Sequence, residues 1–114
     1  TKKANKVAIK RMKQANILLL ANKKDEFYEE ILKALWGYIS DKLNIHLSSL
    51  SKDNVEDKLE KYQVSPTLTK EFIELLNDCE FARFAPGNDY QDTMDRIYTK
   101  SLNIISQMEN SIKH

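Results

Sequence analysis

The sequence predicts an all-α fold, a single compact bundle of about five helices. Apolar residues recur every three or four positions along most of the chain, which is the period of an amphipathic helix. Two glycines and two prolines among 114 residues leave long elements with few breaks. No stretch alternates apolar and polar residues as a strand would. A chain of this length corresponds to about one domain, so residues 1–114 are interpreted as one unit.

The first part of the chain contains two predicted helices. One apolar stripe lies on a helix over residues 3–21 and comprises Ala4, Ala8, Met12, Ala15 and Leu19. A break at residues 22–24 follows, and we interpret Asp25 as the N-cap of a second helix over residues 26–43. This second helix is apolar over a wide surface that includes Trp36, so we expect it to be buried on more than one side.

A polar break and a short helix follow. Residues 44–51 contain three apolar residues that we expect to face the core: Ile45, Leu47 and Leu50. Ser51 is the expected N-cap of a third helix over residues 52–62. In that helix, Val55 and Leu59 lie four positions apart and predict a narrow inward face.

Two longer helices complete the predicted bundle. Ser65 and Pro66 mark the start of the fourth helix, because serine is a common N-cap and proline suits the first turn. Its inward stripe is Leu68, Phe72, Leu75, Cys79 and Ala82. Proline at position 86 must end this helix near residue 84 or 85. Asn88 or Asp89 is expected to cap the fifth helix, which has as its inward face Met94, Ile97, Tyr98, Ser101, Leu102, Ile105, Met108 and Ile112.

Charge is distributed unevenly along the chain. Residues 1–24 contain eight basic side chains and no acidic one, whereas the remainder contains ten basic and seventeen acidic ones. Such a basic block is typical of a segment that binds an anionic membrane surface or a nucleic acid. Six residues are therefore candidate contacts to anionic lipid: Lys2, Lys3, Lys6, Lys10, Arg11 and Lys13. Two alternatives stay open, a nucleic-acid-binding helix and a solvated face that pairs with the acidic remainder.

Residues of the kinds used in catalysis are few. Cys79 lies on an apolar stripe between Asp78 and Glu80, and these charges oppose formation of a thiolate. The two histidines, His46 and His114, are accompanied by no HExxH or CxxC pattern. Glycine-rich phosphate loops and G-x-S-x-G elbows are absent as well. We therefore predict no enzymatic activity, no cofactor and no metal site.

Two further patterns are weighed against a structural interpretation. Asp89, Asp92 and Asp95 share one face at the start of the fifth helix, where acidic groups suit the helix dipole. We interpret them as capping residues rather than metal ligands. The third and fourth helices have the spacing of a helix-turn-helix motif, but "PTLTKEFIE" at residues 66–74 offers one lysine beside two glutamates, which repel phosphate. This disfavours DNA binding through that pair.

The stretch "CEFARFAPGND", residues 79–89, predicts a corner between two helices. Its residues that serve either structure or a partner contact are Phe81, Arg83, Phe84, Pro86 and Gly87. We expect Arg83 to pair with Glu80 along the helix, or to reach helix carbonyls or an acid of a neighbouring helix. Of the two phenylalanines, one is expected to pack inward while the other covers the turn.

Three stretches also resemble one protein family. They are "FYEEILKALWGYISDKLNI" at residues 27–45, "LSSLSKDNV" at 47–55 and "FIELLNDCEFARFAPG" at 72–87. They look like the C-terminal cytosolic domain of BatD proteins of the bacterial aerotolerance operon, and the likeness covers nearly the whole chain. Its specific parts are "ALWGYISDKL" and "CEFARFAPG". His46 departs from the family, in which a proline is expected at this place in the loop.

The resemblance implies a membrane protein with a large extracytoplasmic region, a transmembrane helix and then this domain, at the cytoplasmic face of the bacterial inner membrane. Family members are encoded with a MoxR-type AAA ATPase and with proteins that bear von Willebrand A or TPR domains. A non-catalytic interaction domain with an assembly or chaperone-like role is therefore implied. The sequence starts at Thr1 without methionine, which favours a segment of a longer protein. The basic residues 1–24 suit the cytosolic flank of a membrane helix, although no apolar run here approaches the roughly 20 residues of a span.

Overall fold

The computed structural model describes residues 2–84 and 90–112, of which 85% are helical. Within these residues there are five α-helices, one 3₁₀ turn and no strand, so the predicted all-α bundle is confirmed. The elements are α1 (Lys2–Leu20), α2 (Lys24–Leu43), η1 (Leu47–Ser49), α3 (Lys52–Lys61), α4 (Pro66–Ala82) and α5 (Tyr90–Ser111).

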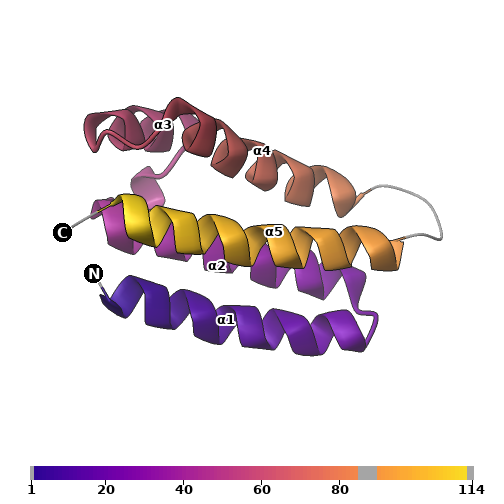
Figure 1. Ribbon diagram of the computed structural model, residues 1–114. Coiled ribbons are helices and arrows are strands. Elements are labelled where there is room, and N and C mark those ends of the chain that lie inside the picture. The colour runs from indigo at the N-terminus through magenta and orange to yellow at the C-terminus, as the bar shows by residue number, and fades with distance from the viewer. Residues whose placement is uncertain (1, 85–89, 113–114) are drawn as a thin grey trace.

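Helix α2 lies at the centre of the bundle and contacts α1, α3, α4 and α5. Figure 1 shows α1, α2 and α5 side by side, with α3 and α4 packed along the opposite edge from α1. The described ends of the chain lie at the same end of the bundle. The prediction that α2 is buried on more than one side is confirmed by the ten buried residues that it contributes.

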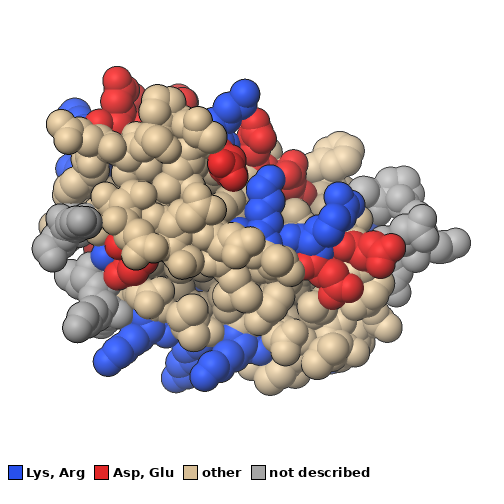
Figure 2. All heavy atoms as spheres, viewed as in Figure 1, with Lys and Arg blue, Asp and Glu red and all other residues tan. Residues whose placement is uncertain are grey.

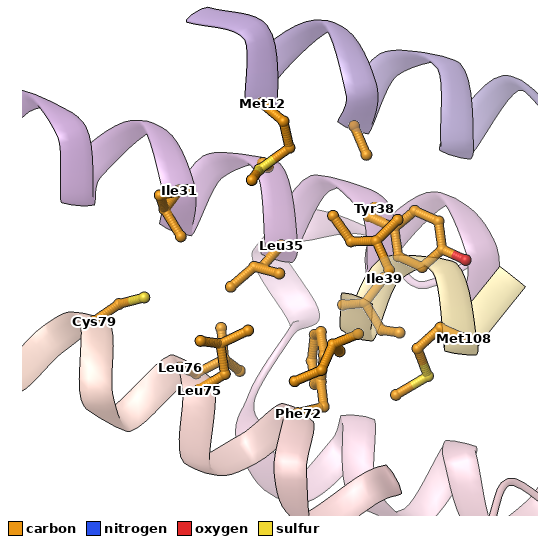
Figure 3. Packing of buried hydrophobic residues seen from close by; sticks show 14 of the residues in the cluster. Met12, Ile31, Leu35, Tyr38, Ile39, Phe72, Leu75, Leu76, Cys79 and Met108 are labelled. Atoms are coloured by element: carbon orange, nitrogen blue, oxygen red, sulfur yellow. The ribbon is translucent and has the colours of Figure 1, made fainter. Parts of the chain in front are cut away.

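The core forms where the apolar stripes of the helices meet. All five predicted inward residues of α1 are buried, and three of them are alanines, which let α1 approach α2 closely. Figure 3 shows Met12 of α1, Leu35 of α2, Leu76 of α4 and Met108 of α5 converging on one apolar cluster. On α5, six of the eight predicted inward residues are buried, while Tyr98 and Leu102 pack against the core half-exposed.

Three helices end in a residue with left-handed backbone geometry: Asn22 with φ 59°, Asn44 with φ 56° and Gln63 with φ 62°. In each case the amide of the following residue donates to the carbonyl five positions earlier, at 3.0 Å. This is the hydrogen bond of a Schellman motif, which normally uses glycine. Asparagine tolerates the geometry because its short polar side chain relieves the penalty, whereas glutamine has no such advantage.

Helices α3 and α4 each start directly after a serine that caps them. Ser51 Oγ accepts a hydrogen bond from the Asn54 amide, and Ser65 Oγ accepts one from the Leu68 amide, both at 3.1 Å. These two predicted N-caps are confirmed. The predicted N-cap at Asp25 is wrong, because α2 begins at Lys24 and the cap position falls on Lys23, which makes no side-chain cap. The Schellman turn that ends α1 directs the chain into α2 early, and Asp25 lies in the first turn instead.

The loop after α2 is only partly anchored. Ile45 and Leu50 pack half-buried against the core, as expected. Leu47 is 61% exposed, so the expectation that it faces the core is wrong. It begins the short η1 turn, which is capped by the His46 ring accepting a hydrogen bond from the Ser48 amide at 3.4 Å. Pro86, Gly87 and the predicted cap of α5 at residue 88 or 89 lie outside the described residues.

Candidate functional site

A groove runs along the face of α2 that the other helices leave uncovered. It encloses about 300 Å³, and its walls come from α1, η1 and the end of α4. We call it the α2 groove and define it by Arg11, Glu29, Leu32, Lys33, Trp36, Gly37, Leu47 and Arg83. Trp36 and Gly37 belong to "ALWGYISDKL" and Arg83 belongs to "CEFARFAPG". The fold therefore brings side chains from these two stretches of the sequence together in one groove.

Trp36 and Gly37 form the open part of the groove. The tryptophan is half-buried and packs against the core. Beside it, a Cβ atom at Gly37 would meet no atom within 4 Å, so no neighbour requires glycine at this position. A half-buried aromatic side chain next to a residue without a side chain offers a surface on which an apolar group can pack.

Arg83 is the cation that the groove leaves available. Its guanidinium carbon lies 5.7 Å from the centre of the Phe84 ring, which is a cation–π contact. The predicted partners are not found: among the described residues the Arg83 side chain forms no ion pair, and Glu80 binds Lys52 at 3.1 Å instead. Glu80 turns toward α3 because Lys52 starts that helix nearby. Stacking on Phe84 holds the guanidinium without neutralising its charge.

Both phenylalanines of this region face solvent. Phe81 is 77% exposed and Phe84 is 80% exposed, so the expectation that one packs inward is wrong. The inward seam of α4 is already filled by Leu75, Leu76 and Cys79, which are fully buried. Phe81 lies on the opposite side of the helix from Cys79, and Phe84 follows the end of α4. Aromatic and arginine side chains are enriched at protein interfaces, so these exposed residues are candidates for a partner contact.

A second candidate surface is the outer face of α1. Lys6, Lys10 and Lys13 are exposed on the side opposite the buried stripe. They share this side with exposed apolar residues, Ile9 at 37%, Ile17 at 59% and Leu20 at 75%. We call these six residues the basic face. Figure 2 shows basic side chains gathered along the lower edge of the molecule, where α1 lies.

Arg11 lies at the border between the basic face and the α2 groove. It is half-buried, and its guanidinium lies 3.7 Å from the carboxylate of Glu30 on α2. It lines the α2 groove, and together with Lys10 and Glu30 it also lines a second hollow on the surface of α1. Lys2 and Lys3 lie in the first turn of α1. Pairing with an acidic residue, as the solvated-face alternative expects, is found at Arg11, whereas Lys6, Lys10 and Lys13 form no ion pair among the described residues.

A buried polar network joins α2 to α5. Tyr38 Oη donates to Glu109 Oε2 at 2.7 Å, and Lys42 Nζ donates to Glu109 Oε1 at 3.1 Å. Lys42 is only 4% exposed, so Glu109 supplies the countercharge that burial of an ammonium group requires. Burial by itself would raise the pKa of Glu109, but the hydrogen bonds from Tyr38 and Lys42 and the charge of Lys42 lower it below 4.5. The network therefore links α2 to α5 through two hydrogen bonds and an ion pair.

Cys79 is fully buried, as its position on the apolar stripe predicted. Burial raises the pKa of its thiol to about 12, and the charges of Asp78 and Glu80 add to the shift. At neutral pH the thiol therefore stays protonated, which disfavours a nucleophilic role.

The remaining candidates form no metal-binding group among the described residues. Asp92 and Asp95 are exposed in the first turns of α5, while Asp89 and His114 lie outside the described residues. Within residues 2–84 and 90–112, no three His, Cys, Asp or Glu side chains are grouped so that they could hold a metal ion. In the same part of the chain, no helix is long and apolar enough to cross a membrane.

The described residues form an all-α bundle with two candidate binding surfaces, the α2 groove and the basic face. Comparison with models of known protein families, with curated proteins and with solved structures gives no match.

Proposed function

We propose that this chain is a non-catalytic protein-interaction domain of a membrane-anchored, BatD-like aerotolerance or assembly protein. One observation carries the proposal: Trp36, Gly37 and Arg83, which belong to the two specific blocks of the resemblance, line one groove. Tryptophan and arginine are the residue types that most often dominate binding energy at protein interfaces. The buried, protonated Cys79 gives no support to a thiol enzyme.

The proposed partners are those that the resemblance implies, a MoxR-type ATPase or a protein with a von Willebrand A domain. The test is calorimetric titration of the domain with each purified partner candidate encoded beside it. We expect Trp36→Ala and Arg83→Ala each to weaken binding at least tenfold, about 1.4 kcal/mol. Arg96→Ala is the matched control, because Arg96 is exposed on α5 away from the groove. Equal losses for Arg83→Ala and Arg96→Ala would remove the groove as the binding site.

The second part of the proposal concerns location. The domain lies at the cytoplasmic face of the bacterial inner membrane, and the basic face contacts anionic lipid. Lysines near such a surface contribute about 1 kcal/mol each, and apolar residues between them insert at the interface. Lys6, Lys10 and Lys13 together with Ile17 and Leu20 provide both contributions.

Vesicle co-sedimentation tests the lipid contact. We expect binding to vesicles with anionic lipid at low salt and a loss of roughly 100-fold in the variant Lys6→Glu/Lys10→Glu/Lys13→Glu. The control, Lys58→Glu/Lys61→Glu/Lys100→Glu, changes net charge equally but lies on α3 and α5. Failure of the unmodified domain to prefer anionic vesicles would contradict the lipid contact.

The exposed lysines of α1 also support an alternative function, nucleic-acid binding. Gel retardation distinguishes the two, since phosphate contacts are strong at about 50 mM salt. A shift at that salt concentration that disappears in the triple variant of α1 would favour nucleic acid over lipid. Absence of any shift removes the alternative.

A further inference from the structure

A second, larger groove lies between α3 and α4. It encloses about 650 Å³. We call it the acidic groove and define it by Glu56, Glu60, Val64, Thr69, Ile73 and Glu74. None of these residues lines the α2 groove, so the two surfaces are separate.

The acidic groove combines an apolar floor with an acidic rim. Val64 is 5% exposed, and Ile73 packs half-buried against the core beside it. Glu56 and Glu60 are exposed one helical turn apart and form no ion pair among the described residues. Lys70 also lines the groove, but its Nζ lies 3.9 Å from Glu74 Oε1. The charge of Glu74 therefore largely offsets the charge of Lys70. The rim therefore keeps a net negative charge.

Thr69 provides a hydrogen-bonding group inside the groove. This residue is 7% exposed and lines the groove. Its hydroxyl group makes no hydrogen bond among the described residues. The hydroxyl oxygen is not cut off from solvent, because the side-chain atom that is both buried and without a hydrogen-bond partner among the described residues is Gln91 Oε1. A ligand seated in the groove can therefore form a hydrogen bond with Thr69 in place of solvent.

We propose that the acidic groove binds a cationic amphipathic helix of a protein partner. Grooves between two helices commonly accept a third helix, which lays its apolar face on the floor. Lysine or arginine side chains flanking that apolar face would meet Glu56 and Glu60 on the rim. Three glutamates against one lysine line the groove, and this local negative charge favours a cationic partner over an anionic one.

Fluorescence anisotropy with a labelled 18-residue peptide of leucine and lysine, patterned as an amphipathic helix, tests the proposal. We expect saturable binding that weakens at least tenfold in Glu56→Lys/Glu60→Lys. The matched control is Asp41→Lys/Asp95→Lys, which changes net charge equally at exposed positions on α2 and α5 and is expected to weaken binding less than threefold. Thermal unfolding of both variants shows whether each keeps its fold.

Further measurements distinguish a cationic helix from other possible occupants of the acidic groove. Thr69→Val, which removes only the hydroxyl function, is expected to weaken binding two- to fivefold. A peptide with glutamate in place of lysine is expected not to bind. Equal losses in the two double variants would overturn the groove in favour of general charge attraction. Sedimentation equilibrium showing self-association that Glu56→Lys/Glu60→Lys abolishes would overturn a separate partner and make the basic face of a second copy the occupant.

The proposal stands independently of the α2 groove. Trp36→Ala, which tests the proposed function, is expected to leave the affinity for the leucine–lysine peptide unchanged. A loss in Trp36→Ala as large as in Glu56→Lys/Glu60→Lys would mean that the peptide occupies the α2 groove and would overturn the proposal. Failure of the proposed function and failure of the acidic-groove proposal would therefore give different results.

Discussion

Gly37 is the residue at which local helix preference and the observed structure disagree. Glycine inside a helix costs about 0.5–1 kcal/mol relative to alanine. Here an added Cβ would meet nothing within 4 Å, so packing does not account for the cost. We attribute the glycine to the flat floor that it keeps beside Trp36 in the α2 groove.

Gly37→Ala is therefore expected to stabilise the domain by about 0.5–1 kcal/mol in urea unfolding, because alanine restricts the unfolded chain and favours the helix. In calorimetry it is expected to weaken binding of a partner in the α2 groove, since the methyl group occupies the floor. Gln107→Ala on α5 controls for a general gain from alanine. A stabilised variant that binds the partner as well as the unmodified domain would contradict the role given to Gly37.

Cys79 gives a second prediction at this scale. Its thiol is fully buried and its pKa is raised to about 12, mainly by desolvation, so at pH 8 the thiol stays protonated. Iodoacetamide is expected to leave the folded domain unmodified and to label it fully in denaturant, as followed by mass spectrometry. Labelling of the native domain at the rate of free cysteine would overturn the burial and reopen a thiol chemistry.

The sequence predicts the burial of some single residues better than that of others. Cys79 lies on a periodic stripe, so its burial follows from spacing alone. Phe81 and Phe84 are apolar residues off the stripe, and hydrophobicity alone suggested that one of them packs inward. Their exposure depends on Leu75 and Leu76 having filled the seam, which is a property of packing that a single stripe does not reveal.

At the scale of elements, helix bounds follow from caps and breaks. The starts of α3 and α4 were predicted from Ser51 and Ser65, because these side chains satisfy amides that the helix leaves free. The start of α2 was misplaced by two residues, since the turn that ends α1 uses a left-handed Asn22 with no glycine to mark it. The pairing of Tyr38 and Lys42 with Glu109 joins positions far apart in sequence and carries no local signal.

Gln63 at the end of α3 provides a test of this turn geometry. Its φ of 62° is left-handed, a conformation that costs a residue with a Cβ about 1 kcal/mol. Gln63→Gly is expected to stabilise the domain by about 0.5 kcal/mol, the relief of strain being partly offset by the more flexible unfolded chain. Gln107→Gly within α5 is the control and is expected to destabilise by about 1 kcal/mol. Destabilisation by both changes, measured in urea, would contradict the turn.

The hydrogen-bonded network of Tyr38, Lys42 and Glu109 predicts that the stability of the fold depends on pH. The pKa of Glu109 is lowered in the folded state, so its stabilising effect is full above the unfolded-state value near 4.5. It is lost as the pH falls through the lowered folded-state value. Glu109→Gln is expected to cost about 1–3 kcal/mol at pH 7, because Lys42 loses a charged hydrogen-bond partner. The variant is also expected to show a shallower loss of stability as the pH falls below the unfolded-state value near 4.5.

Urea unfolding of Glu109→Gln at a series of pH values measures this dependence. Asp95→Asn serves as control, because Asp95 is exposed on the same helix and is expected to change stability by less than about 0.5 kcal/mol. Identical pH profiles for the Glu109 variant and the unmodified domain would show that Glu109 does not titrate as the network requires.

At the scale of the whole molecule, opposite charges are placed on different surfaces. The basic face lies on α1, and the acidic groove lies between α3 and α4 at the other edge of the bundle. The sequence already indicated the separation of charge, because residues 1–24 contain no acid. Which helices border the uncovered face of α2 depends on the tertiary arrangement, so the α2 groove could not be predicted from stripes and caps.

The interaction role is tested most directly at Trp36, which is the only tryptophan in the chain. Its indole N–H gives a single resonance in the ¹⁵N-labelled domain and reports on the α2 groove alone. On titration with an unlabelled partner candidate, the MoxR-type ATPase first, this resonance and the amides of Gly37 and Arg83 are expected to shift or broaden while those of α5 stay in place. Binding that leaves the Trp36 resonance unchanged, or no binding by any of the proposed partners, would contradict the proposed interaction role of the α2 groove.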